Sequence, residues 1–282
     1  MKVERYLWRK AVDRAIHMAC MAATLVALVP LGSVLYYVFS RGIGGINFEF
    51  FTELPKPVGE EGGGMSQAIS GTLKLVGLAC LFGIPPGILA GVYLAERGQT
   101  PFGRLARFAA DVLAGIPSIT VGLFVYALVV TSTRRFSAFA GGIALAILML
   151  PTIARSTEEL LRLVPEALRE AALGLGVTNW RATLRVILRT AAPGIAVGVM
   201  LAVARVAGET APLLFTAFNN RFWSESLSEP MASLPVSIYT YAVSPYEDWH
   251  RQAWAAALVL LVMVLALNVS ARVLVRHRVK SR

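Results

Sequence analysis

Long apolar segments recur along the whole chain, separated by shorter polar stretches. Most are long enough to cross a bilayer, which takes about 20 apolar residues. Their approximate bounds are 16–39, 68–95, 108–131, 138–154, 191–217 and 254–271. The pattern predicts an all-α membrane protein with six transmembrane helices. An even number of spans places both termini on the same side of the membrane.

Composition agrees with this prediction and argues against a soluble enzyme. Hydrophobic residues make up 56% of the 282 positions and charged residues only 16%, whereas soluble domains carry about 25% charged residues. The first apolar segment, 16–39, follows a basic stretch as a signal peptide would. It is long enough to span and lacks an A-x-A cleavage site, so we interpret it as a transmembrane helix.

The net charge is +10, and the distribution of the basic residues along the chain indicates the membrane topology. With the termini assigned to the cytoplasm, 19 of the 27 Lys and Arg residues lie inside and six outside, as the positive-inside rule requires. The basic residues are therefore expected to meet anionic lipid headgroups, and nucleic acid is not an expected partner. Arg134 and Arg135 are exceptions, because they lie in the short outer turn between the third and fourth spans.

The chain divides into two regions at the end of its first long loop. Residues 1–67 comprise the N-terminal tail, the first transmembrane helix and an outer loop, and residues 68–282 form the transmembrane core. An inner loop at 155–190 is long enough to hold helices of its own.

Local signals predict where those inner helices begin and end. Ser156 and Glu159 fit a capping box at the start of one helix. Pro165 suits the first turn of a second helix, and Gly174 and Gly176 suit its C-terminal end.

Motifs for covalent chemistry or metal binding are missing from the sequence. G-x-x-x-x-G-K-[ST], G-x-S-x-G and HExxH do not occur, so any ATP would have to be bound by another chain. Cys20 and Cys80 lie in apolar segments, and the three histidines are far apart in sequence. We therefore predict no catalytic residue, no metal site and no bound cofactor.

The most informative charges inside the membrane are Arg205 and Glu209. Residues four apart share one face of a helix, and Arg205 lies about 21 Å along the fifth span, near the bilayer midplane. A charge at this depth is costly and usually faces a bundle interior or a water-filled path. Pro212 leaves the carbonyl of Gly208 without its helical partner. Either Arg205 attracts a passing anion while Glu209 holds it, or the two form an ion pair that only fixes packing.

Four other polar residues in the spans allow two interpretations. Ser118 and Thr210 could donate hydrogen bonds to an oxyanion, although hydroxyls in membrane helices more often bond to their own backbone. Lys74 and Asp111 lie near the ends of their spans and are expected to extend toward the headgroups.

The inner loop contains Glu170, Ala171 and Ala172, followed by Gly176. Small alanines on one helix face permit the close approach of another surface, and the carboxylate offers an ion pair to a basic partner. By itself this pattern is weak, since short amphipathic helices that end in glycine are common.

Residues Glu170 to Gly176 nevertheless match the EAA-x3-G loop of permease subunits in bacterial ABC importers. Further segments make the resemblance more specific: 115–124, 202–215, 234–236 and 244–245. From about Gly71 to the last span, the chain resembles the permeases of phosphate-specific importers. One departure is Arg189, where importer permeases often have a proline.

The resemblance implies a type I importer permease in the bacterial inner membrane. Its expected partners are a sister permease, two copies of a cytoplasmic ATP-binding subunit that carries ATP and Mg²⁺, and a periplasmic phosphate-binding protein. Arg205 and Glu209 become candidate residues of the phosphate path. Glu170, Ala171, Ala172 and Gly176 become the contact with the ATPase.

Two alternatives stay open. The chain could be an ABC permease for another oxyanion, such as sulfate or molybdate. It could also be a stand-alone secondary transporter or channel, which would not need the EAA segment. A purely structural membrane scaffold would leave Arg205 and Glu209 unexplained.

Overall fold

The computed structural model describes residues 2–57, 59–60 and 62–280, and nearly all of its regular structure in this part is helical. The long helices are α1 (Lys2–Gly42), α3 (Ser66–Arg97), α4 (Pro101–Gly115), α7 (Ala138–Arg162), α10 (Leu188–Val206) and α13 (Glu247–Lys280). The shorter helices are α2 (Phe48–Thr52), α5 (Ser118–Val125), α6 (Thr131–Thr133), α8 (Glu166–Gly174), α9 (Asn179–Ala182), α11 (Ala211–Thr216) and α12 (Leu234–Ala242). A 3-10 turn, η1 (Ile43–Gly45), and two π-helical turns, η2 (Tyr126–Val130) and η3 (Thr183–Ile187), continue neighbouring helices.

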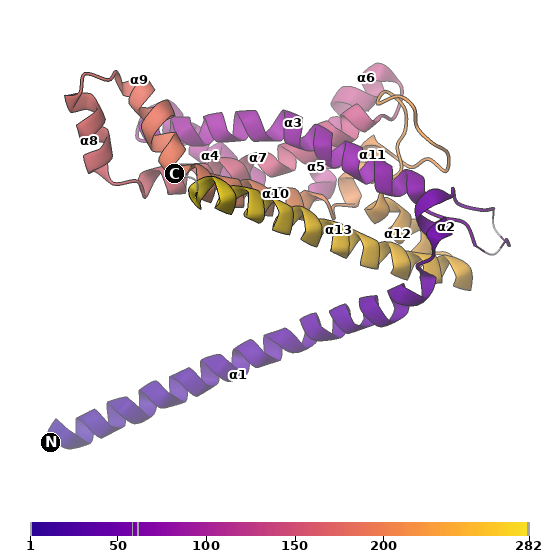
Figure 1. Cartoon of the computed structure of the whole chain (residues 1–282), viewed down its shortest axis with the longest axis horizontal. Helices are drawn as coiled ribbons and strands as arrows, with labels where there is room; N and C mark the ends of the chain where they lie inside the picture. Colours follow the sequence, from indigo (N-terminus) through magenta and orange to yellow (C-terminus); the bar gives the residue numbers. More distant parts are fainter. Residues whose placement is uncertain (1, 58, 61, 281–282) are drawn as a thin grey trace.

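The predicted all-α membrane fold is confirmed. Five helical segments within the described residues are long and apolar enough to cross a membrane. Two shorter helices that meet at a sharp bend make a sixth if they are counted as one span. Both chain ends lie at the end of the molecule that carries α8 and α9, as the even number of spans predicts (Figure 1).

The third span differs from the predicted continuous helix over 108–131. Helix α4 ends at Gly115, and the chain turns by 105° before α5 begins at Ser118. Pro117 disfavours helical backbone in the residue before it, and Ile116 is extended, with ψ 132°. The proline thus converts an apolar segment of spanning length into two shorter helices.

The fifth span is also broken. The apolar segment 191–217 holds two helices, since α10 ends at Val206 and α11 begins at Ala211, close to the interruption that Pro212 indicates in the sequence. Pro212 cannot donate to the carbonyl of Gly208, and the helix has already ended before that position. Residues 207–210 form a turn in the middle of the predicted span.

Helix α7 packs against α3 at the centre of the bundle. Glycines on α3 allow this approach, because an added Cβ at Gly87 would lie 2.8 Å from the Ile153 side chain and one at Gly91 would lie 2.5 Å from Thr157. The largest buried core includes residues from α3, α5, α7, α10, α11 and α12: Leu75, Val121, Leu145, Met149, Val206, Leu213 and Val236.

The predicted capping box at Ser156 and Glu159 is wrong. Helix α7 runs without interruption to Arg162. The Ser156 hydroxyl donates to the carbonyl of Ile153 within that helix. Ile153 and Leu161 are both buried, so tertiary packing extends the helix past a local N-cap signal.

The first span stands apart from the rest of the chain. None of the residues in its most apolar 18-residue stretch is buried. Helix α1 diverges from the bundle toward its N-terminus (Figure 1). Its C-terminal end is anchored, because a Cβ at Gly42 would lie 2.7 Å from the Trp254 carbonyl oxygen on α13. The outer loop that follows packs into a cluster through Phe50 and Met65, which are buried with Leu234.

Helices α5 and α11 are in backbone contact next to the two breaks. A Cβ placed at Gly122 of α5 would lie 2.6 Å from Cα of Pro212 in α11. Val121 and Leu213, on either side of this contact, belong to the same buried core. The contact therefore fixes the distance between the helices that follow each break.

Gly122→Ala should destabilise the protein by about 1 to 3 kcal/mol, because the new methyl group has no space against the α11 backbone. Thermal unfolding of the detergent-solubilised protein would measure this. Gly77→Ala is the matched control, since a Cβ at Gly77 meets nothing within 4 Å. Equal melting temperatures for the two variants would contradict the close contact.

Candidate transport and coupling sites

The turn between α10 and α11 carries both membrane charges that the sequence singles out. Arg205 lies in the last turn of α10 and is exposed, whereas Glu209 follows the helix and is half-buried. The amide of Gly208 donates to the Arg205 carbonyl, and the amide of Glu209 donates to the Val206 carbonyl. These bonds form a tight turn that takes Glu209 off the α10 face.

The predicted Arg205–Glu209 pairing is therefore not seen. No ion pair or side-chain hydrogen bond joins either residue to any part of the chain that the structure describes. The i, i+4 argument fails because the helix ends between the two residues. The hypothesis that they form a self-contained packing pair loses its geometric basis.

Arg205 continues an exposed stripe along α10. Val197 and Leu201, which precede it by eight and four residues, are 37% and 59% exposed. Since residues four apart lie on one helix face, this face of α10 is directed away from the core of the chain. The Arg205 guanidinium is thus available to a ligand or to another chain.

Ser118 and Thr210 occupy equivalent places at the two breaks. Ser118 is the first residue of α5, and Thr210 directly precedes α11. Both are half-buried, and within the described residues neither hydroxyl has a hydrogen-bond partner. The Thr216 hydroxyl, by contrast, donates to the Pro212 carbonyl at 2.7 Å. The hydroxyls of Ser118 and Thr210 are therefore free to donate hydrogen bonds to a ligand. The contact between Gly122 and Pro212 holds their two helices together.

A buried charge cluster between α4 and α7 was missed by the sequence reasoning. Glu158 is only 2% exposed, and its carboxylate pairs with Arg107 of α4 and with Arg155 and Arg162 of α7. Arg155 also pairs with Asp111. The i, i+3 and i, i+4 spacing of Arg155, Glu158 and Arg162 is a sequence signal for such pairs on one helix. The sequence predicts that the span ends at residue 154, whereas α7 continues to Arg162.

The two other membrane charges do not extend freely toward headgroups as expected. Asp111 pairs with Arg155. The ammonium of Lys74 donates to the Ser224 carbonyl at 3.3 Å, which ties α3 to the outer loop before α12.

The EAA residues lie on α8, at the end of the molecule that also holds both chain ends (Figure 1). Glu170 and Ala171 are exposed, whereas Ala172 is 7% exposed. The helix starts directly after Pro165, one residue later than the sequence predicted. Two faces result: Ala172 packs inward, and Glu170 and Ala171 are accessible.

Gly176 ends α8 through its backbone. Its φ is +78°, its amide donates to the Leu173 carbonyl, and the amide of Val177 donates to the Ala172 carbonyl. These two bonds make a Schellman motif, which places glycine at the left-handed position. A Cβ there would meet nothing within 4 Å, so the glycine is needed for conformation and not for space.

Arg169 fixes α8 to the membrane helices. Its guanidinium holds both carboxylate oxygens of Glu96 at the end of α3, and the Thr183 hydroxyl donates to the same carboxylate. Hydrogen bonding to Glu96 raises the pKa of Arg169 above its ordinary value. A bidentate Arg–carboxylate pair gives orientation as well as energy, so α8 is held in one position.

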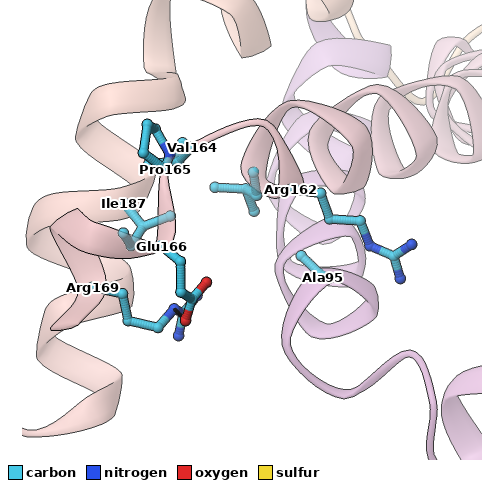
Figure 2. Close-up of a pocket in the computed structure, with 8 residues that line it drawn as sticks. Ala95, Arg162, Val164, Pro165, Glu166, Arg169 and Ile187 are labelled. Atoms are coloured by element: carbon cyan, nitrogen blue, oxygen red, sulfur yellow. Dashed lines mark ion pairs between the residues drawn. The ribbon is translucent and has the colours of Figure 1, made fainter.

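A cavity of about 160 Å³ separates α8 from the ends of α3 and α7. Figure 2 shows Arg169 and Glu166 on one side of it and Arg162 with Ala95 on the other. Several large apolar side chains in and next to α8 and α9 are exposed: Leu163, Leu168, Leu173, Leu175, Trp180 and Leu184. An exposed apolar patch next to accessible charge is typical of a protein interaction site.

Residues 87–281 match a family described as the binding-protein-dependent transport system inner membrane component. A phosphate transport system permease protein PstA from Yersinia pestis is 44% identical over 272 residues, which cover 96% of this chain and 92% of that protein. A PstA from Xylella fastidiosa is 45% identical, and the match covers 95% of this chain and 94% of that protein. A PstA 1 from Mycobacterium tuberculosis is 40% identical, and the match covers 88% of this chain and 82% of that protein.

Among solved structures, a bacterial alginate ABC transporter in complex with an alginate-bound periplasmic protein matches with a TM-score of 0.65. The match covers 94% of this chain and 95% of that one, at 19% identity. The inward-facing MetNI methionine ABC transporter matches with a TM-score of 0.62, covering 76% and 96%, also at 19% identity. These structures share the fold of the chain.

Glu158→Gln should lower the stability by about 3 kcal/mol, because it leaves three arginines around a neutral group. Asp111→Asn is the control: the Asp111 side chain is 52% exposed, and its loss should cost about 1 kcal/mol or less. Thermal unfolding of the solubilised protein would compare them. A cluster without structural importance would give two equally small shifts.

Reversing either charge of the Glu96–Arg169 pair should loosen α8, and reversing both should restore it. Chymotrypsin cleavage at the exposed Trp180 reports the loosening for Glu96→Arg, Arg169→Glu and the double variant. Glu166→Gln is the control, since that carboxylate is 73% exposed and 3.6 Å from Arg169. If the double variant is cleaved as fast as the single variants, the pair does not anchor α8.

Proposed function

We propose, on the premise that this chain belongs to the family of phosphate transport system permease proteins PstA, that it forms half of a membrane pathway for the import of inorganic phosphate. The chain is a multi-pass transport subunit of an ABC importer and not an enzyme. The sequence contains no phosphate-binding G-x-x-x-x-G-K-[ST] loop, so ATP and Mg²⁺ are assigned to a separate ATPase subunit.

The observation that carries this proposal is an unpaired arginine at a break in a membrane helix. Arg205 is exposed, and within the described residues its guanidinium has no carboxylate partner. A charge inside a membrane protein that is not used for packing usually faces a water-filled path or a substrate. Interrupted helices near the midplane are a common way to build such sites.

The chemistry of the break suits a tetrahedral oxyanion. The guanidinium of Arg205 can give two parallel charge-assisted hydrogen bonds to phosphate oxygens. The free hydroxyls of Ser118 and Thr210 are the candidate neutral donors. Transport also requires release, and one arginine binds more weakly than a cluster would. Glu209, three residues beyond the end of α10, limits the positive potential without neutralising Arg205 by direct contact.

The inner helix α8 is the proposed site of coupling to ATP hydrolysis. Glu170 and Ala171 present an accessible carboxylate beside a small side chain, and exposed leucines surround them. Ala172 and Gly176 keep the helix packed and correctly ended. A push on α8 would pass to α3 through Arg169 and to α7 through the connecting turn, so closure of the ATPases would move both membrane helices.

The complete importer is proposed to contain four kinds of subunit. The exposed α10 stripe suits a sister permease that completes the other half of the path. Two copies of a cytoplasmic ATP-binding subunit would dock on α8 and on its counterpart. A periplasmic phosphate-binding protein would deliver the substrate, and the family indicates the bacterial inner membrane as the location.

Arg205→Gln should reduce uptake of labelled phosphate about tenfold or more, because a hydrogen bond to a charged group contributes about 1.5 to 3 kcal/mol. Uptake is measured in energised cells that lack the native gene. Arg189→Gln is the control, an exposed arginine at the inner end of the same helix. Excess unlabelled sulfate is added to test selectivity.

Each outcome bears on a separate part of the proposal. Full uptake by Arg205→Gln would remove the arginine from the pathway. Strong competition by sulfate would indicate a permease for another oxyanion. Uptake that does not require the ATPase subunits would indicate a stand-alone transporter.

A further inference from the structure

Two arginines on the outer side of the molecule lie where the topology of the chain does not call for them. The other outward-facing segments carry four basic and eight acidic residues, yet Arg134 and Arg135 are adjacent in the turn between α6 and α7. Both are exposed. Within the described residues neither guanidinium has an ion-pair or hydrogen-bond partner.

The backbone of this turn is held in an unfavourable conformation. Arg134 has φ 54°, in the left-handed region, which residues with side chains rarely adopt. A positive charge near a helix C-terminus is favourable, but this explains only the charge, since glycine or asparagine suits the left-handed position better. Strain of this kind concentrates at functional sites.

The only other non-glycine residue of the described chain with positive φ is Phe218, just after α11. Its ring stacks on Phe136 with centroids 4.9 Å apart, and the amide of Ser137 donates to the Thr216 carbonyl at 3.0 Å. The two strained turns therefore brace each other. Both lie at the end of the molecule opposite α8 (Figure 1).

These turns are the outer ends of the two helices that begin at the mid-membrane breaks. One is α11, which follows Thr210. The other is the continuous helical segment 118–133, which begins at Ser118 and is about 24 Å long at 1.5 Å per residue. Gly122 and Pro212 hold these helices in contact. The arginine turn therefore lies at the outer end of the same helix pair whose other ends carry the candidate path residues.

We propose that Arg134 and Arg135 form an outer binding site for a tetrahedral oxyanion, which the anion occupies before it reaches Arg205. This rests on the proposed function and adds an entry site to it. Each exposed guanidinium can donate charge-assisted hydrogen bonds to phosphate oxygens. Their charge raises the local anion concentration at the mouth, and the effect falls as salt screens it.

The test uses the complete transporter in proteoliposomes with ATP inside and increasing concentrations of phosphate-loaded binding protein outside. The Arg134→Gln, Arg135→Gln double variant should show an approximately tenfold lower maximal uptake rate. The half-saturating concentration of binding protein should stay unchanged. The corresponding double Lys variant should keep most of the rate, and added salt should slow the wild type more than the double Gln variant.

Two controls separate the entry site from general effects. Arg41→Gln removes another exposed outer arginine in the last turn of a helix and should leave the uptake rate unchanged. Arg134→Gly removes one charge while suiting the left-handed backbone, so it should fold normally and still lose part of the rate. The amount of assembled transporter and its ATP hydrolysis without binding protein are measured for every variant.

Other outcomes would overturn the entry site. A higher half-saturating concentration with an unchanged maximal rate would mean that the arginines dock an acidic surface of the binding protein. An unchanged rate, or an equal loss in Arg41→Gln, would mean that they do not bind the anion. Failure of the wild type to import phosphate would overturn the proposed function itself, whereas a defect confined to the variants would not.

Discussion

The backbone contact between Gly122 and Pro212 is the constraint on which the proposed pathway depends. Both helices that follow a break are too short to span a membrane alone. Each break leaves backbone groups without helical partners. Their contact keeps Ser118 and Thr210 on neighbouring helices and joins the breaks to the buried core through Val121 and Leu213. In a membrane, irregular backbone is tolerated only where protein covers it or where it lines a cavity. The same contact therefore allows the breaks to exist and positions them.

Helix α7 connects this region to the inner side. It packs against α3 and ends at Arg162, a short turn before α8 begins at Glu166. The Glu158 cluster fastens α7 to α4, and the Arg169–Glu96 pair fastens α8 to α3. A displacement of α8 can thus reach α3 through the Arg169–Glu96 pair, α7 through its packing on α3, and α4 through the Glu158 cluster. Helix α4 ends at the first break. A buried ion-pair cluster is by itself weak evidence for stability. The Glu158 cluster lies between α7 and α4, where it can transmit a movement of α7 to α4.

Much of the fold could be predicted from the sequence, because membrane helices must satisfy their backbone hydrogen bonds internally. The six apolar segments and the end of α8 at Gly174 to Gly176 follow from local chemistry. The orientation stays a prediction from the Lys and Arg distribution. The continuous third span was wrong, whereas the break in the fifth span lies just before Pro212, the residue that indicates it in the sequence. A proline inside an apolar segment can either kink or break a helix, and which occurs depends on whether neighbouring helices cover the freed groups.

The sequence by itself determined the apolar segments, the family resemblance and the identity of the polar residues, and it predicts the orientation. Tertiary structure decided which of those residues meet. Glu158 pairs with Arg107, 51 positions away, and Glu96 pairs with Arg169, 73 positions away, whereas Arg205 and Glu209, only four apart, do not pair. Sequence spacing specifies neighbours only while one helix continues, and whether it continues depends on packing against other segments. For this reason local sequence signals predict the helices, whereas the contacts between the polar residues become known only from the folded bundle.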